Sequence, residues 1–158
     1  MKVAIGSDHA GYEVKEIVKK TLQEMGLEYE DFGTHSAESV DYPDFAGRVA
    51  EAVAQGQAGR GLLICGTGIG MSIVANKFPG VRAAVCHNAE TARLSREHND
   101  ANVLAIGART TPIKTIDKIV RTFFNTEFAS GRHERRVEKV KNLDNGRSRH
   151  QMTSEKIQ

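Results

Sequence analysis

Short apolar runs and segments with a helical repeat alternate along the chain. The runs are rich in Val, Ile, Leu and Ala, as in buried strands, whereas the segments between them repeat apolar residues every three or four positions, as in helices. The predicted strands cover residues 2–6, 27–32, 62–64, 81–86 and 102–107. The predicted helices cover residues 12–25, 43–55, 71–78, 88–97, 112–124 and 132–142.

This alternation predicts the fold class. Successive strands that are joined by helices form a parallel sheet with right-handed crossovers, and ligands bind beyond the carboxyl ends of its strands. We predict an α/β fold, a three-layer Rossmann-like sandwich around a five-stranded parallel sheet, as a single domain at residues 1–143. The polar segment 144–158 is expected to be a poorly ordered tail.

The composition narrows the classes of function. The chain has 158 residues, a net charge of +2 and no Trp, whereas nucleic-acid-binding proteins more often show a basic stripe with interleaved aromatic residues. No apolar run approaches the roughly 18 residues of a membrane span, and no signal peptide precedes the first strand. We therefore expect a cytoplasmic protein that binds neither nucleic acid nor membrane. The two cysteines lack the spacing of a zinc site, so we expect free thiols and no metal.

The segment 61–77, GLLICGTGIGMSIVANK, holds the most distinctive chemistry. Cys65 ends an apolar strand, and three glycines at alternate positions, with Thr67 among them, lead into a helix. Such a turn exposes backbone N–H groups at the positive end of a helix dipole, which favours a negative charge. The segment therefore predicts a site where an anion forms or binds beside a thiol that could act as base or nucleophile.

Each candidate also has a simpler explanation. The glycine pattern lacks the features of dinucleotide-binding and Walker loops, and it could be only a tight turn. A lone Cys is more often a buried apolar residue, while His9 could cap the following helix and His98 could be an exposed loop residue. Residues 41–44 read first as a helix start. Arg132 and Arg136 share one side of a helix, which suits either a phosphate or a solvated face.

Five segments occur in order: GSDHAGYEVK at 6–15, DYPDFA at 41–46, ICGTGIGMSIVANK at 64–77, LSREHNDANVLAIGAR at 94–109 and GRHERRV at 131–137. With them the chain closely resembles the ribose-5-phosphate isomerase B family, which includes galactose-6-phosphate and allose-6-phosphate isomerases. The resemblance implies an aldose–ketose isomerase that interconverts D-ribose 5-phosphate and D-ribulose 5-phosphate through an enediolate, without metal or cofactor. Two alternatives stay open, a hexose 6-phosphate substrate and a non-catalytic sugar-phosphate sensor.

The resemblance also implies catalytic roles. Cys65 is similar to the family's base, His98 to the histidine that opens the furanose ring, and Thr67 to a hydrogen-bonding assistant. The stretch 72–76 carries no carboxylate that could replace the thiol as base. The implied substrate-binding residues are Asp8, His9, Tyr42, Gly66, Gly68, Ile69, Gly70, Met71, Asn99, Arg109, Arg132 and Arg136.

The resemblance also implies which residues bind the phosphate and how the chains assemble. His9, Arg132 and Arg136 are similar to the family's phosphate ligands, and Arg109 is a weaker candidate. Family members form homodimers or homotetramers with the site at the subunit interface. The resemblance therefore implies that the C-terminal helix reaches a partner subunit and that its arginines serve the partner's site.

Overall fold

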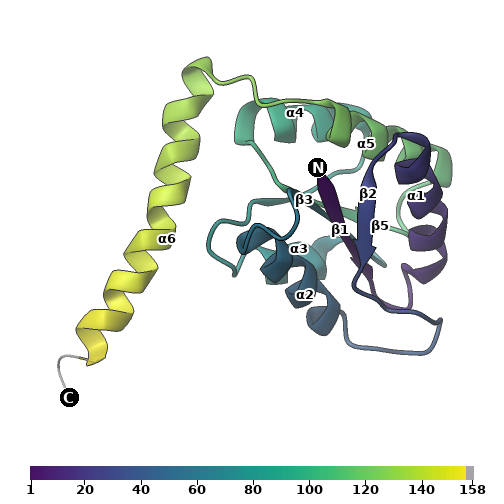
Figure 1. The fold of residues 1–158 in the computed structure, drawn as a ribbon, viewed down its shortest axis with the longest axis horizontal. Coiled ribbons are helices and arrows are strands. Elements are labelled where there is room, and N and C mark those ends of the chain that lie inside the picture. The colour runs from purple at the N-terminus through teal and green to yellow at the C-terminus, as the bar shows by residue number, and fades with distance from the viewer. Residues whose placement is uncertain (156–158) are drawn as a thin grey trace.

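The computed structural model describes residues 1–155, which form an open sheet with helices on both faces (Figure 1). The strands are β1 (Lys2–Ser7), β2 (Glu28–Asp31), β3 (Arg60–Cys65), β4 (Ala83–Val85) and β5 (Val103–Gly107). The helices are α1 (Tyr12–Glu24), α2 (Tyr42–Ala54), α3 (Ile69–Ala75), α4 (Ala89–Asn99), α5 (Ile113–Asn125), the 3-10 turn η1 (Gly131–His133) and α6 (Glu134–Glu155). The predicted α/β, Rossmann-like fold is confirmed.

All neighbouring strands of the sheet are parallel, in the order β2-β1-β3-β5-β4. Ser7 at the end of β1 pairs with Ile64 of β3, and Cys65 pairs with Gly107 at the end of β5. The carboxyl ends of these three strands therefore lie side by side. This carboxyl edge, the end of the sheet at which its strands finish, is where parallel sheets bind ligands.

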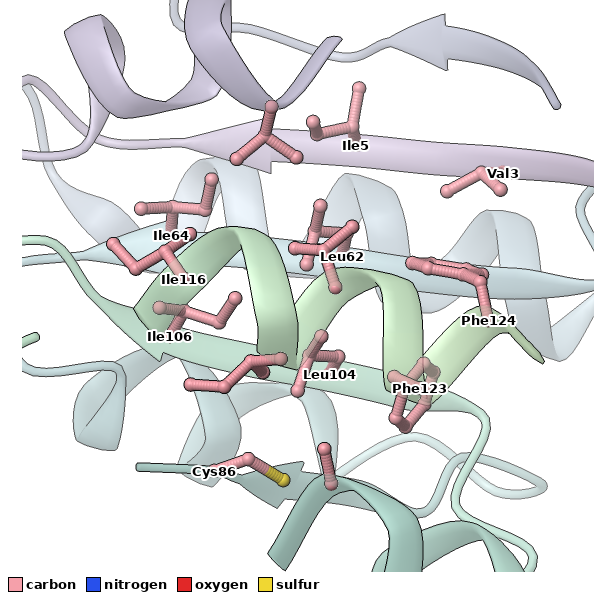
Figure 2. Packing of buried hydrophobic residues seen from close by; sticks show 14 of the residues in the cluster. Val3, Ile5, Leu62, Ile64, Cys86, Leu104, Ile106, Ile116, Phe123 and Phe124 are labelled. Atoms are coloured by element: carbon pink, nitrogen blue, oxygen red, sulfur yellow. The ribbon is translucent and has the colours of Figure 1, made fainter. Parts of the chain in front are cut away.

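Each face of the sheet has its own apolar core. Figure 2 shows Ile116 and Phe123 of α5 packed against the strands, with Phe123 beside Leu104 of β5. Because side chains of a strand alternate between faces, Leu63 and Cys65 point to the other face, where they join the core beneath α2 and α3. The Cys65 thiol is thus held in place by a packed core rather than by a loop.

Two helices end later than the sequence predicts. The polar residues 98–100 were expected to form a loop, but α4 continues to Asn99 and stops only at Asp100, whose φ of 47° is left-handed. Helix α6 continues to Glu155 instead of ending near residue 142. Polar composition alone does not stop a helix, and the segment contains no Pro that would do so. The end of the predicted tail, 156–158, lies outside the described residues.

Helix α6 projects away from the sheet and its covering helices (Figure 1). It contacts the rest of the chain through buried Val137 and through the Asp144 carboxylate, which accepts from the Gly80 N–H at 2.9 Å. Val140 and Leu143 remain 49% and 68% exposed. An apolar strip of α6 therefore faces solvent in the single chain. Within residues 1–155, no helix is long and apolar enough to cross a membrane.

Candidate active site

The glycine loop forms a sharp turn between β3 and α3. Cys65 is almost fully buried, and the Gly68 N–H donates to its Sγ at 3.1 Å. The Ser72 N–H makes a helical bond to the Gly68 carbonyl at 3.1 Å, so the earlier N–H groups of Gly70 and Met71 have no partner within the helix. One turn therefore presents a thiol together with N–H groups that can bind an anion.

Steric contacts fix the shape of this turn. Gly68 has a φ of 79°, and a Cβ there would lie 2.9 Å from the Ile106 carbonyl carbon. A Cβ on Gly70 would lie 2.7 Å from two ring atoms of Tyr42. The loop therefore packs closely against β5, and the half-exposed Tyr42 ring covers its rim. The predicted start of a helix at residues 41–44 is confirmed, because α2 begins at Tyr42. Tyr42 is therefore both the first residue of α2 and a neighbour of the glycine loop.

Asp8 and His9 lie at the same carboxyl edge, directly after β1. The Asp8 N–H donates to the Ile64 carbonyl at 3.3 Å, and its carboxylate accepts from the Gly11 N–H at 3.1 Å. His9 does not cap α1. Its Nδ1 instead accepts from the Val40 N–H at 3.1 Å, which leaves Nε2 as the ring nitrogen that can meet a ligand.

Arg109, Thr67 and Met71 also lie at the carboxyl edge, and they differ in which of their groups a substrate can reach. The Arg109 N–H donates to the Gly66 carbonyl at 3.0 Å, and the Arg109 side chain passes beside Gly66. Thr67 is exposed, and its Oγ1 accepts from the Ile69 N–H at 3.3 Å. The Met71 side chain is fully buried, so only its backbone can meet a substrate.

The other predicted residues line a cavity of about 460 Å³. His98 and Asn99 come from the last turn of α4, Arg132 from η1 and Arg136 from α6. The two arginines were expected on one helix. They belong to two successive elements, yet both line the same cavity. Its other lining residues are Asn76, Arg82, His133, Val137 and Val140.

His133, which the sequence did not single out, also lines the cavity. Its ring stacks on that of His98, with centroids 4.1 Å apart and an interplanar angle of 17°. Desolvation lowers the pKa of His133 below its ordinary value of 6.5, and the charges of His98, Arg132 and Arg136 lower it further. Arg82 was not singled out either, because it lies within a predicted strand and carries no motif signal. The cavity thus gathers cationic groups of the kind that bind phosphate.

The predicted site residues form two groups, one around Cys65 and one around His98. These groups lie at opposite ends of the strands. Cys65 pairs with Gly107, where β5 ends, whereas His98 and Asn99 precede Val103, where β5 begins. A strand of this length separates its two ends by about 13 Å at about 3.3 Å per residue. None of the residues around Cys65 lines the cationic cavity. A single chain therefore does not bring His98 to the thiol.

Residues 3–140 match the family model described as Ribose/Galactose Isomerase. The chain belongs to this family. Its relative Ribose-5-phosphate isomerase B of Escherichia coli (strain K12) is 46% identical over 147 residues, which are 93% of this chain and 99% of that protein. The D-erythrulose-4-phosphate isomerase of Pectobacterium atrosepticum is 40% identical, over 89% of this chain and 93% of its own length.

A solved family structure agrees with the fold of this chain. Clostridium thermocellum Ribose-5-Phosphate Isomerase B is 53% identical and matches with a TM-score of 0.90 over 92% of this chain and 99% of its own. The resemblance seen in the five motifs is therefore confirmed, and with it the prediction of an isomerase. Among the described residues, no group of three or more His, Cys, Asp or Glu is arranged to hold a metal ion.

Proposed function

We propose that the chain interconverts D-ribose 5-phosphate and D-ribulose 5-phosphate through an enediolate, with Cys65 as the base. The observation that carries the proposal is the hydrogen bond from the Gly68 N–H to the Cys65 Sγ, at 3.1 Å. A backbone donor at this distance supports a negative charge on the sulfur. The Escherichia coli relative, named Ribose-5-phosphate isomerase B, supports a pentose phosphate as substrate.

The reaction moves one proton between neighbouring carbons. The Cys65 thiolate removes the proton from C2 of the open-chain aldose, the C1–C2 double bond forms, and the C1 carbonyl oxygen becomes an oxyanion. The N–H groups of the glycine loop stabilise this oxyanion, as preorganised donors do in other enzymes. The O2 proton moves to O1 with help from the Thr67 hydroxyl, and Cys65 returns its proton to C1. The product is the ketose, and the thiolate is regenerated.

Substrate binding at the carboxyl edge follows from the free groups there. The Asp8 carboxylate accepts from one backbone N–H and has lone pairs left for sugar hydroxyls. His9 Nε2 and the Arg109 guanidinium can reach a phosphate from the same edge. Tyr42 and the exposed Ile69 border the loop and would limit the space for the sugar chain.

A second copy of the chain completes the site in this proposal. His98 acts as general acid and base for ring opening, Asn99 contacts the sugar, and Arg132 and Arg136 bind the phosphate. Within one chain, His98 and Asn99 precede β5 and Cys65 lies where β5 ends, about 13 Å further along at about 3.3 Å per residue. Arg132 and Arg136 line the cavity of His98 and Asn99, not the loop of Cys65. They can serve the thiol only if a partner supplies them.

Exposed apolar strips support such an assembly. Ile69 and Ile73 on α3 are 53% and 57% exposed, and Val140 and Leu143 on α6 are 49% and 68% exposed. Exposed apolar side chains that share one helix face favour a protein–protein contact there. In a twofold homodimer, the commonest oligomer, α6 of each chain would lie over α3 of the other and bring the cationic cavity to the partner's loop. A homotetramer built from such dimers would keep the same contact.

A hexose 6-phosphate is the second candidate substrate, because the matching family is described as Ribose/Galactose Isomerase. Values of kcat/KM for ribose 5-phosphate, galactose 6-phosphate and allose 6-phosphate distinguish the two. We expect the highest value for ribose 5-phosphate, and a clear preference for a hexose phosphate would replace this assignment. Binding without turnover of any of the three would favour a sugar-phosphate sensor.

Two cysteine variants test the base. Cys86 is the matched control because it is also buried, but burial raises the pKa of its thiol, and hydrogen bonds to Ser95 and Thr91 only partly oppose this effect. Cys65→Ala is expected to lower kcat by about 100-fold or more, while Cys86→Ala keeps the wild-type kcat. Substantial turnover by folded Cys65→Ala would refute the base role.

A further inference from the structure

Asp100 adopts an uncommon backbone conformation at the point where α4 ends. Its φ of 47° and ψ of 44° are left-handed, a region that few non-glycine residues occupy. Arg96 Nη1 donates to its Oδ1 at 2.9 Å, and Arg82 Nη2 donates to its Oδ2 at 3.4 Å. Arg82 Nε and Nη2 also donate to the Asp100 carbonyl, at 3.0 and 2.8 Å. Two arginines therefore hold the turn that directly follows His98 and Asn99.

Arg96 extends this network to the segment between α5 and η1. Its side chain is 4% exposed, and its Nε donates to the Thr126 carbonyl at 3.0 Å. Nearby, the Ala129 N–H donates to the Glu97 carbonyl at 3.1 Å. The last turn of α4 is thus tied to the segment that leads into η1 through the two residues that precede His98.

We infer that Arg96 and Asp100 are positioning residues that hold His98 against His133 without touching the substrate. Neither residue lines the cavity, whereas both histidines do. The inference rests on the proposed function, in which His98 opens the furanose ring. Because small displacements of a reacting group slow a reaction strongly, loosening this turn impairs ring opening more than proton transfer at Cys65.

Asp100→Asn is the test variant, because Asn also tolerates the left-handed conformation but carries no charge. Asp117→Asn is the matched control. Asp117 likewise accepts from an arginine four residues away, with Arg121 Nε at 2.9 Å, and it does not line the cavity. Arg96→Lys provides a second test, because a lysine keeps the charge but loses the planar fork that reaches two acceptors.

Two rates separate the steps. Isomerisation of ribose 5-phosphate begins with ring opening, which needs His98. Exchange of the C1 proton of ribulose 5-phosphate in deuterium oxide needs only the proton transfer, because this ketose cannot close a furanose ring through its phosphorylated O5. A merely structural defect lowers both rates in proportion to the folded fraction, whereas a positioning defect lowers the first alone.

Asp100→Asn and Arg96→Lys are expected to lower kcat/KM for ribose 5-phosphate by about 10- to 100-fold. The exchange rate at saturating ribulose 5-phosphate should stay near that of the wild type, and Asp117→Asn should change neither rate. Parallel loss of both rates, or no loss in either, would overturn the inference. If Asp100→Asn does not fold, Asp100→Gly keeps the left-handed turn without strain and carries the same expectation.

An NMR measurement without substrate tests the positioning role even if the chain has no isomerase activity. The nuclear Overhauser effect between the His98 and His133 rings should weaken in Asp100→Asn and persist in Asp117→Asn. An unchanged effect in both variants would overturn the positioning role even if the chain had no isomerase activity. If the wild type showed neither rate while the two rings still separated in Asp100→Asn, only the proposed function would be refuted.

Discussion

Replacing Gly68 with alanine tests whether the glycine loop has the shape that the thiol needs. At its φ of 79°, a residue with a side chain costs about 1–2 kcal/mol. The added Cβ would also lie 2.9 Å from the carbonyl carbon and 3.1 Å from the nitrogen of Ile106. The backbone of β5 cannot yield as a flexible side chain can, so overpacking adds about 1–3 kcal/mol. Gly68→Ala should therefore lower the free energy of unfolding by about 2–5 kcal/mol.

Gly26→Ala separates the two contributions. Gly26 has a φ of 71°, but nothing lies within 4 Å of a Cβ built there, so only the conformational cost of about 1–2 kcal/mol applies. Urea unfolding of the wild type and both variants measures the two losses of stability. Gly68→Ala should also lower kcat at saturating substrate, because the N–H that donates to Cys65 must move. Equal destabilisation of the two variants, or a wild-type kcat in Gly68→Ala, would refute the reasoning.

Three further predictions concern ionisable groups. Lys15→Met removes the fully buried ammonium that lies 2.6 Å from Asp31 Oδ1 and leaves this carboxylate to Lys19 and the Gly33 N–H, and it should cost about 1–3 kcal/mol in urea unfolding; a loss below about 1 kcal/mol, typical of exposed pairs, would contradict it. Burial raises the pKa of Asp31, but hydrogen bonds from Lys15, Gly33 and Lys19 together lower it below 3.8. Ionised Asp31 therefore stabilises the fold at neutral pH, and this stabilisation is lost as the pH falls below about 4 through the folded pKa; unfolding curves at several acidic pH values should show a steeper loss for the wild type than for Asp31→Asn. NMR titration should find the pKa of His133 below 6.5 and raised by inorganic phosphate, and a pKa unaffected by phosphate would argue against an anion in the cavity.

Most of the fold could be predicted from patterns among residues that are close together in the sequence. Strand and helix periodicities depend on neighbouring residues, so the order of elements and the parallel sheet followed from them. The residues around Cys65 could be found for the same reason, because the strand end, the glycines and the helix start are contiguous at 61–77. The end of α4 could not be found, since the left-handed turn at Asp100 is held by Arg82, which lies outside the helix, as well as by Arg96.

The cationic cavity depends on tertiary contacts that leave little trace in the sequence. The motif GRHERRV at 131–137 indicated Arg132 and Arg136. His133 became a candidate only in the structure, where its ring stacks on that of His98. His98 and Asn99 end the helix that precedes β5, and in a parallel sheet the connection from a helix into the next strand lies at the amino ends of the strands, opposite Cys65. The cavity that these two residues share with Arg132 and Arg136 emerges only in the three-dimensional course of the chain.

Subunit complementation tests the central claim most directly, namely that Cys65 of one chain works with the arginines of another. Cys65→Ala and Arg136→Ala should each be nearly inactive alone. In a mixed dimer, one of the two shared sites combines the wild-type Cys65 with the wild-type Arg136. Random reassembly of equal amounts should therefore restore about one quarter of wild-type kcat, by the twofold symmetry of the dimer. Mixtures that stay as inactive as the separate variants would contradict the account.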